Sequence, residues 1–388
     1  MTDLETRVKE VWSLLHSMPE VGFEEFKTAA YLAEQLEKAG YNVKTGIGGT
    51  GVTGLLDSGH PGPTICIRAD MDALAHSVNG QECAIHSCGH DAHAAMVLTV
   101  AEAIVPRSIK NGKVKIFFQP AEEKLFGALR TIEDGVIEDV DILLGIHLRP
   151  IQEAKLNQAT PALCHGASYI MEAEIQGEAS HGARPHLGVN AVDAAAAVVN
   201  AINAIHVNPV IPATAKVTKL QAGGAALNAI PDRAYMAFDL RAQSNAVMEE
   251  LQAKATQAIK GGAATVGACA AIELTGGCPA AEYNDDMIVL AREAIAAVLG
   301  EQGVLDPITT PGGEDFHFFV KHKPSLKTGY IGLGADLTPG LHNPAMVFNP
   351  AALINGVNIL LYMVDKLVGS GAGEIAYTLS APKSCSNS

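Results

Sequence analysis

The chain has 388 residues, of which 48% are hydrophobic and 18% are charged. This length exceeds that of an ordinary single domain, so we expect two domains, or one large domain into which another is inserted. The formal net charge of −15 argues against a nucleic-acid partner, or an anionic membrane, bound through bulk charge. A local arginine can still bind a small anionic substrate, because screening limits the reach of distant charges.

The cysteines and the apolar segments of the sequence indicate the cellular compartment of the protein. Seven cysteines are an odd number without a C-x-x-C pair, which predicts a fold without disulfides. No apolar run reaches the roughly 20 residues needed to span a bilayer, and residues 1–10 are charged rather than signal-like. We therefore expect a cytoplasmic protein with no membrane partner.

The first 150 residues alternate between helical and strand patterns, in chain order. Apolar residues at helical spacing predict helices around residues 8–15 and 29–36. Short β-rich runs predict strands, and a helix follows the second of them: strands over residues 51–56, 63–70, 113–119 and 140–147, helix over 92–104. This alternation predicts an α/β domain with a mixed, mostly parallel sheet flanked by helices. Ligands bind at the carboxyl edge of such sheets.

From about residue 167 the pattern changes to that of a second domain. The expected order is strand, helix, two strands, helix and strand, over residues 168–176, 190–205, 213–221, 233–242, 247–260 and 270–275. This βαββαβ order is typical of a ferredoxin-like α+β domain. Because α/β patterning then resumes, we expect a discontinuous catalytic domain, residues 1–166 and 277–388, interrupted by a dimerisation or lid domain, residues 167–276. The tail, residues 369–388, is rich in Gly and Ser and is expected to be loose.

The densest chemical signal is His86-Ser-Cys88-Gly-His90-Asp91-Ala-His93. Thiolate, imidazole and carboxylate groups together suit zinc, manganese, cobalt or nickel. A simpler interpretation is a helix start capped by Asp91, with the histidines solvated or hydrogen-bonded. So many ligand types at one strand-to-helix junction have few structural reasons to gather, which favours a metal site.

Two adjacent carboxylates, Glu122 and Glu123, follow the apolar strand over residues 113–119. They would repel each other unless a positive charge lies beside them, and a metal supplies that charge. Neighbouring residues at a strand end point in different directions, so one can ligate while the other acts as a general base. The alternative is an exposed helix start, where acidic residues favour the helix dipole. His147 and His342, each taken alone, would be unremarkable.

The order of the motifs resembles the aminoacylase-type metallopeptidases, family twenty, and specifically its subfamily D of amidohydrolases, which includes hippurate hydrolase, indole-3-acetyl-amino-acid hydrolases and aminobenzoyl-glutamate hydrolase. The resemblance covers nearly the whole chain. Its motifs are Leu15-His16-x-x-Pro19-Glu20-x-Gly22-Phe23-Glu24-Glu25, Arg68-Ala-Asp70-Met-Asp72, the His86 to His93 cluster, Gln119-Pro-Ala-Glu122-Glu123, Gly145-x-His147, Ser180-His181, Asn228-x-Ile230-Pro231-Asp232, Gly313-Glu314-Asp315-Phe316 and Leu341-His342-Asn343-Pro344.

The resemblance implies a set of roles for individual residues. Glu122 would be the general base, and Asp70 would orient a histidine ligand. His181 would contact substrate or oxyanion in the partner subunit's site, which implies a homodimer or higher homo-oligomer. Asn228 and Arg241 would bind the substrate, although a surface ion pair is the simpler interpretation of Arg241. Two divalent metal ions (Mn, Zn, Co or Ni) would be held by Cys88, His90, Glu123, His147 and His342.

The resulting hypothesis is a metal-dependent amidohydrolase. Water activated by two cations would attack the amide of a small N-acyl amino acid or a peptide-like conjugate, with Glu122 taking the proton. One alternative keeps this site in a dipeptidase or an arylamine-releasing hydrolase. Another is a noncatalytic metal-binding protein, which would not need a free glutamate facing an open coordination position. The broader family has a His-x-Asp motif where this chain has Arg68-x-Asp70, so the metal identity stays open.

Overall fold

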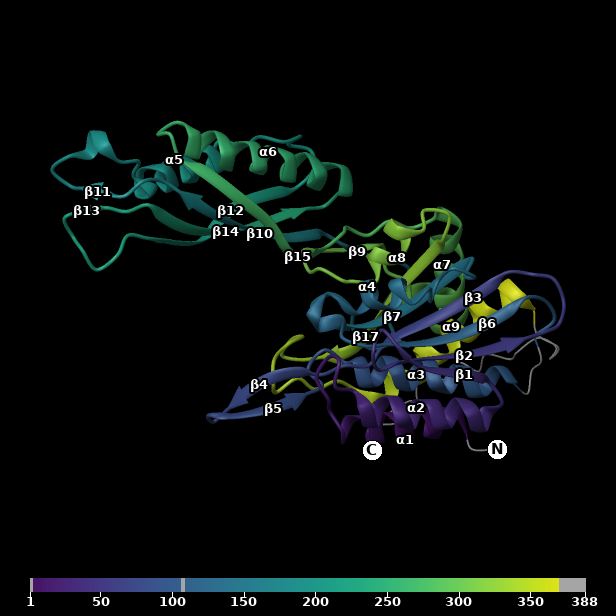
Figure 1. The fold of residues 1–388 in the computed structure, drawn as a ribbon. Coiled ribbons are helices and arrows are strands. Elements are labelled where there is room, and N and C mark those ends of the chain that lie inside the picture. Colours follow the sequence, from purple (N-terminus) through teal and green to yellow (C-terminus); the bar gives the residue numbers. More distant parts are fainter. Residues whose placement is uncertain (1–2, 106–108, 370–388) are drawn as a thin grey trace, which may run out of the picture. The chain divides into compact units, whose positions relative to one another are not determined.

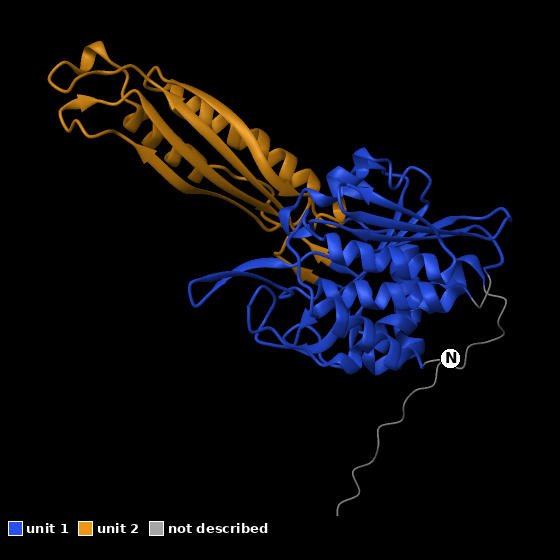
Figure 2. Cartoon of the chain, turned by 60° about the horizontal axis from the view of Figure 1, so that its bottom comes forward, with its two compact units in different colours: residues 1–163, 282–308, 318–388 blue, residues 164–281, 309–317 orange. Residues whose placement is uncertain are grey.

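The computed structural model describes residues 3–105 and 109–369. The expected loose tail therefore lies outside the described residues, apart from Gly369. The chain divides into two compact units (Figure 2). The first comprises residues 1–163, 282–308 and 318–388, and the second comprises residues 164–281 and 309–317. The second unit overlaps the expected insertion, residues 167–276, and includes one further short segment.

The first unit is built on a seven-stranded sheet of order β1-β2-β6-β3-β7-β17-β8. The central strands β6, β3, β7 and β17 run parallel, whereas β1, β2 and β8 pair antiparallel towards the edges. The mixed, mostly parallel α/β sheet predicted from the sequence is thus confirmed. The strands are β1 (Asn42–Ile47), β2 (Gly51–Asp57), β3 (Thr64–Asp70), β6 (Lys113–Gln119), β7 (Ile142–Pro150), β8 (Ala159–Thr160) and β17 (Lys327–Leu337).

Helices pack against this sheet, and α3 is the helix that the others surround. Nearly every residue of α3 is buried, because α1, α2 and α9 pack against it while β3 contacts it from the sheet (Figure 1). A helix enclosed in this way is apolar all round rather than along one stripe. The helices are α1 (Leu4–His16), α2 (Phe26–Ala39), α3 (His90–Ile104), η2 (Glu122–Lys124), α4 (Gly127–Glu133), α7 (Asp285–Leu299), η4 (Glu301–Gly303), η5 (Pro350–Ala352) and α9 (Leu353–Val368).

The apolar segment Pro350–Val368 forms η5 and α9, a helix that was not predicted from the sequence. By length and composition this segment could cross a membrane. Leu353, Val357 and Leu360 are, however, fully buried in the core of the first unit. Packing against α3 and α7 explains the apolar sequence of a core helix, so the segment is weak support for a membrane span.

The second unit has a four-stranded antiparallel sheet of order β12-β14-β10-β15. Alternate residues of β10, such as Met171 and Ile175, are buried beneath α5 and α6, whereas Glu174 faces solvent. The chain order β10-α5-β12-β14-α6-β15 is the predicted βαββαβ pattern. The elements are β10 (Ala167–Gln176), α5 (Ala191–Asn203), β12 (Ala213–Ala222), β14 (Arg233–Ala242), α6 (Asn245–Ala264) and β15 (Cys269–Cys278).

The remaining elements are short. A hairpin of β4 (Leu74–Val78) and β5 (Gln81–Ile85) follows β3, and its polar, mostly exposed residues gave no strand signal in the sequence. The others are β9 (Leu163–His165), β11 (Ser180–His181), η3 (Pro185–Leu187), β13 (Ala229–Ile230), β16 (Ile308–Thr310) and α8 (His317–His322).

Candidate active site

The predicted metal ligands converge at the carboxyl ends of the parallel strands of the first unit. Glu123 follows β6, His147 lies near the end of β7, and Cys88 and His90 lie at the N-terminal end of α3. His342 comes from the loop between β17 and η5. Parallel strands β6, β3 and β7 bring these ends to one sheet edge, where ligands bind in open α/β sheets.

The side chains form overlapping groups in which all ligand atoms lie within 4.8 Å of one another. The Sγ of Cys88 lies 3.6 Å from the Nε2 of His147. The Oε1 of Glu123 lies 3.4 Å from the Nε2 of His342 and 3.7 Å from the Nε2 of His90. The groups that include the predicted ligands are Cys88-His90-His147, Cys88-Glu123-His342, His90-Glu122-Glu123 and Asp70-His90-His93. Because Cys88 belongs to two groups, the set can hold a pair of neighbouring cations.

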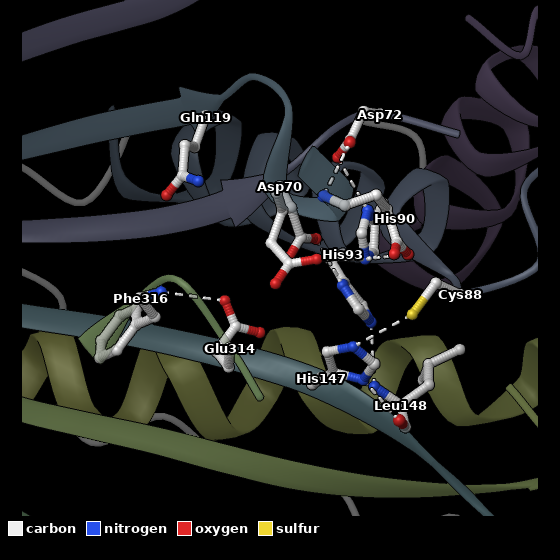
Figure 3. A network of polar contacts seen from close by, with 12 residues as sticks. Asp70, Asp72, Cys88, His90, His93, Gln119, His147, Leu148, Glu314 and Phe316 are labelled. Atoms are coloured by element: carbon white, nitrogen blue, oxygen red, sulfur yellow. Dashed lines mark hydrogen bonds and ion pairs between the residues drawn. The ribbon is translucent and has the colours of Figure 1, made fainter. Parts of the chain in front are cut away.

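Two of the histidines are oriented so that Nε2 points into this cluster (Figure 3). The Nδ1 of His147 lies 2.6 Å from the backbone oxygen of Leu148. That oxygen only accepts, so Nδ1 is protonated and Nε2 is left as the electron-pair donor. The Nδ1 of His90 lies 3.1 Å from the Oδ1 of Asp72, which orients the ring in the same way.

Asp70 forms its histidine hydrogen bond with a residue other than the predicted ligands, although its Oδ2 also lies 3.9 Å from the Nε2 of His90. Its Oδ1 binds the Nδ1 of His93 at 2.7 Å (Figure 3). Its Oδ2 accepts from the Nη1 of Arg68 at 2.7 Å. The Nε2 of His93 accepts the backbone N–H of Leu148 at 2.9 Å. Both nitrogens of His93 are therefore engaged within the protein, and His93 is not one of the predicted ligands. Asp70 orients His93.

The carboxylate that orients a predicted ligand is Asp72, which the sequence analysis quoted but did not single out. Its Oδ1 faces His90, and its Oδ2 accepts the backbone N–H of Glu123 at 3.1 Å. The only signal in the sequence was its place two residues after Asp70. Asp-x-Asp at the end of a strand does not indicate which carboxylate meets which histidine.

The electrostatics of the cluster fit divalent cations. The Nε2 of His90 and the Oε1 of Glu123 are buried without a hydrogen-bond partner in the described part of the chain. Burial raises the pKa of the Cys88 thiol. Burial opposes protonation of His90, but Asp70 and Cys88 raise its pKa well above the usual value. The neighbouring Cys88 and Glu123 raise the pKa of His342 to about 10.

A bound cation would bring positive charge to this site in place of protons. Cations bind deprotonated thiolate, neutral imidazole and carboxylate, so metal binding would displace these protons. A donor set of sulfur, nitrogen and oxygen suits zinc, manganese, cobalt or nickel. The residues present fit the metal ions predicted from the sequence.

Glu122 lies beside this cluster, and it is buried. Its Oε2 lies 4.0 Å from the Nε2 of His90. Ala121, immediately before it, has φ 53° and ψ 42°, in the left-handed region. Both Glu122 and Glu123 therefore reach the cluster from the single turn η2.

The predicted residues of the second unit divide into two groups. His181 in β11 is exposed, and it pairs in register with Ala229 of β13. Asn228 immediately precedes β13, and its backbone oxygen accepts from the N–H of Gly182 at 2.7 Å. The structure therefore brings His181 and Asn228 together, one in β11 and the other just before β13.

Arg241 does not join them. It lies near the end of β14 and pairs in register with Ser168 and Thr214, whereas Asn228 and β13 precede the start of that strand. Its Nε donates to the Oδ1 of Asp239 at 2.8 Å, and its side chain is 44% exposed. The structure thus favours the simpler interpretation of Arg241 as a surface ion pair.

Comparison with known proteins identifies the family. The pattern of peptidase family M20/M25/M40 matches residues 66–366. The hippurate hydrolase of Campylobacter jejuni is 32% identical, over 90% of this chain and 94% of that protein. The N-acetyl-L-cysteine deacetylase of Bacillus subtilis is 28% identical, over 95% of this chain and 90% of that protein.

A solved structure supports the same family. The YXEP protein of Bacillus subtilis, described as a dinuclear metal binding peptidase of the M20 family, superimposes with a TM-score of 0.78 at 25% identity. The alignment covers 94% of this chain and 98% of that chain. The chain belongs to peptidase family M20/M25/M40, and it is an amidohydrolase of that family. The family resemblance seen in the sequence is confirmed.

Proposed function

We propose that this amidohydrolase cleaves the amide bond of N-acyl amino acids or related small conjugates, using two divalent cations per subunit. The observation that supports this most directly is the cluster at the carboxyl edge of the sheet, in which Cys88 belongs to two ligand groups and Glu122 lies beside them. The relatives named hippurate hydrolase and N-acetyl-L-cysteine deacetylase support the substrate class, because both names denote N-acylated amino acids.

The proposed chemistry assigns separate tasks to the residues. The cations, held by Cys88, His90, Glu123, His147 and His342, would activate water and polarise the amide carbonyl. Glu122 takes the proton of the attacking water and delivers it to the leaving nitrogen. His181 donates a hydrogen bond to the developing oxyanion, and Asn228, which immediately precedes β13, binds the substrate.

The protein is further proposed to be a homodimer and to be located in the cytoplasm. A homodimer would place His181 of one subunit in the site of its partner, and the exposed residues of the edge strand β12 are available for pairing with a second copy. The cysteines in the described residues are free thiols, which supports a reducing compartment, the cytoplasm.

The test is a substrate panel assayed with and without metal. N-acetyl, N-benzoyl and indole-acetyl amino acids, dipeptides and an arylamide are incubated with protein that a chelator has stripped, and then with added manganese, cobalt or zinc. We expect no hydrolysis by stripped protein and restored hydrolysis of the N-acyl amino acids. Preference for dipeptides or the arylamide would favour the alternative hydrolases. Full activity without metal would contradict the two-cation site, and metal binding without any hydrolysis would favour the noncatalytic alternative.

A further inference from the structure

The turn that presents Glu122 and Glu123 has an unusual backbone. Ala121 adopts φ 53° and ψ 42°, and Leu125, at the other end of η2, has φ 55°. Residues other than glycine populate this left-handed region rarely. Such a conformation persists only where the surrounding structure holds it in place. The residues that hold Ala121 therefore determine where the next two side chains point.

The side chain of Glu25 is one of those residues. Its Oε1 accepts the backbone N–H of Ala121 at 2.8 Å, although the two residues are 96 positions apart in the sequence. Its Oε2 accepts the hydroxyl of Thr50 at 2.5 Å. Glu25 and Ala121 are both 0% exposed. A buried N–H without an acceptor is costly, so this contact favours the observed turn.

Glu25 has no local task that would explain its burial. It is the N-cap residue of α2, yet its side chain makes no capping hydrogen bond. The free N–H groups of that helix are instead bound by Glu20, which accepts from the backbone nitrogens of Lys27 and Thr28. Burial raises the pKa of Glu25, because a carboxyl group that is removed from water ionises less readily.

The same turn is held from other directions. A side chain at Gly22 would place its Cβ 2.9 Å from the Cα of Ala121, so this glycine permits a close approach of the two backbones. Glu123 lies two residues after Ala121, and its backbone N–H donates to the side chain of Asp72 at 3.1 Å. The turn is thus fixed by Glu25 at its start and by Asp72 within η2.

We propose that Glu25 is a positioning residue, whose buried carboxylate holds the backbone of Ala121 so that Glu122 and Glu123 reach the metal cluster in the correct geometry. The proposal rests on the proposed function of that cluster. Glu25 touches neither substrate nor cation, and it acts through the peptide N–H of Ala121. A displacement of about 1 Å at a catalytic group costs about 10²-fold in rate.

The test compares two substitutions at Glu25. Gln keeps an amide oxygen as acceptor for Ala121 and an NH₂ group that can donate to Thr50, so Glu25→Gln should retain most of the turnover. Glu25→Leu removes the acceptor. It should lower kcat by about 10²-fold with little change in KM. It should also alter the visible absorption of the cobalt-loaded protein, because the position of Glu123 changes.

Matched controls separate positioning from general destabilisation. Thr28→Val removes a buried hydroxyl of the same segment, which donates to Glu20 at 3.0 Å and does not reach the turn. It should leave kcat and the cobalt spectrum unchanged. Gly22→Ala presses on Ala121 from another side and should reproduce the effects of Glu25→Leu, which keeps the test decisive if Glu25→Leu does not fold.

The outcomes are distinct. Loss of turnover and an altered spectrum in Glu25→Leu and Gly22→Ala, but not in Glu25→Gln and Thr28→Val, would support the proposal. Equal effects of Glu25→Gln and Glu25→Leu, or an unchanged cobalt spectrum in both Glu25→Leu and Gly22→Ala, would overturn it. If the unmodified protein hydrolyses no substrate, the proposed function fails, while the cobalt spectra still decide whether Glu25 positions the turn.

Discussion

At the residue scale, the adjacent carboxylates of η2 are proposed to perform different tasks. Glu122→Gln keeps the shape of the side chain and should keep bound metal, while turnover falls by roughly two orders of magnitude, the usual scale for loss of a general base. Glu123→Gln removes a charged ligand and should lower the metal content instead. Both properties are measured on the same preparations, as kcat/KM and as bound metal per chain. Equal metal content in the two variants would contradict this division.

The thiol of Cys88 should determine which metals are preferred. A thiolate favours softer cations such as zinc over manganese, and Cys88 Sγ lies within the groups formed with His147 and with Glu123 and His342. Cys88→Ser should therefore reduce the affinity for zinc more than that for manganese. Competition titrations of the two metals measure the ratio of affinities. An unchanged ratio would exclude Cys88 as a ligand.

At the element scale, the site depends on how α3 is joined to the strands. His93 on α3 connects Asp70 at the end of β3 to the backbone of Leu148 on β7. This bridge fixes the strand end next to His147, whose Nδ1 binds the oxygen of the same Leu148. The positions of β3 and β7 at the cluster are thus linked by a buried side chain that is not one of the predicted ligands.

Removing that bridge should destabilise the fold. His93→Leu leaves the N–H of Leu148 and an oxygen of Asp70 buried without their partner, and unsatisfied buried groups cost about 1–3 kcal/mol each. The free energy of unfolding is measured in denaturant on chelator-treated protein. It should fall by at least the cost of one unsatisfied group, about 1–3 kcal/mol. Leucine at the exposed His60 is the matched control and should have little effect. An equal effect of the two substitutions would show that the bridge does not stabilise the protein.

At the scale of the whole molecule, the proposed dimer makes each active site dependent on two chains. His181→Ala and Glu122→Ala homodimers should each be nearly inactive. In a mixed dimer, one site combines an intact Glu122 with the intact His181 of the other chain, while the second site lacks both. Mixing the two inactive variants under subunit exchange should restore up to about half the activity per mixed dimer if the sites act independently.

Two results would contradict this arrangement. Sedimentation or light scattering would first establish whether the protein is a dimer, and a monomer would remove the basis of the prediction. Absence of recovery despite proven exchange would mean that His181 acts within its own chain or not at all. Arg241→Ala serves as a comparison, because its ion pair with Asp239 is exposed and its loss should change activity little.

The sequence by itself determined the elements and the chemical composition of the site. Local periodicity predicted α1, α3 and the strands β2, β3, β6 and β7, because side-chain spacing in a helix or strand depends only on nearby residues. The soft and hard ligands from Cys88 to Glu123 were visible as motifs at strand ends. The polar hairpin of β4 and β5 had no comparable periodicity, and it was not predicted.

Only the tertiary structure decided which side chains meet. It assigned Asp70 to His93 and Asp72 to His90, although both carboxylates belong to one short motif. It also brought Glu25 to the N–H of Ala121, 96 residues further along the chain. Such pairings depend on how strands and helices from distant parts of the sequence pack together, and a local pattern contains no record of that packing. Spacing identifies candidate groups, whereas the fold selects their partners.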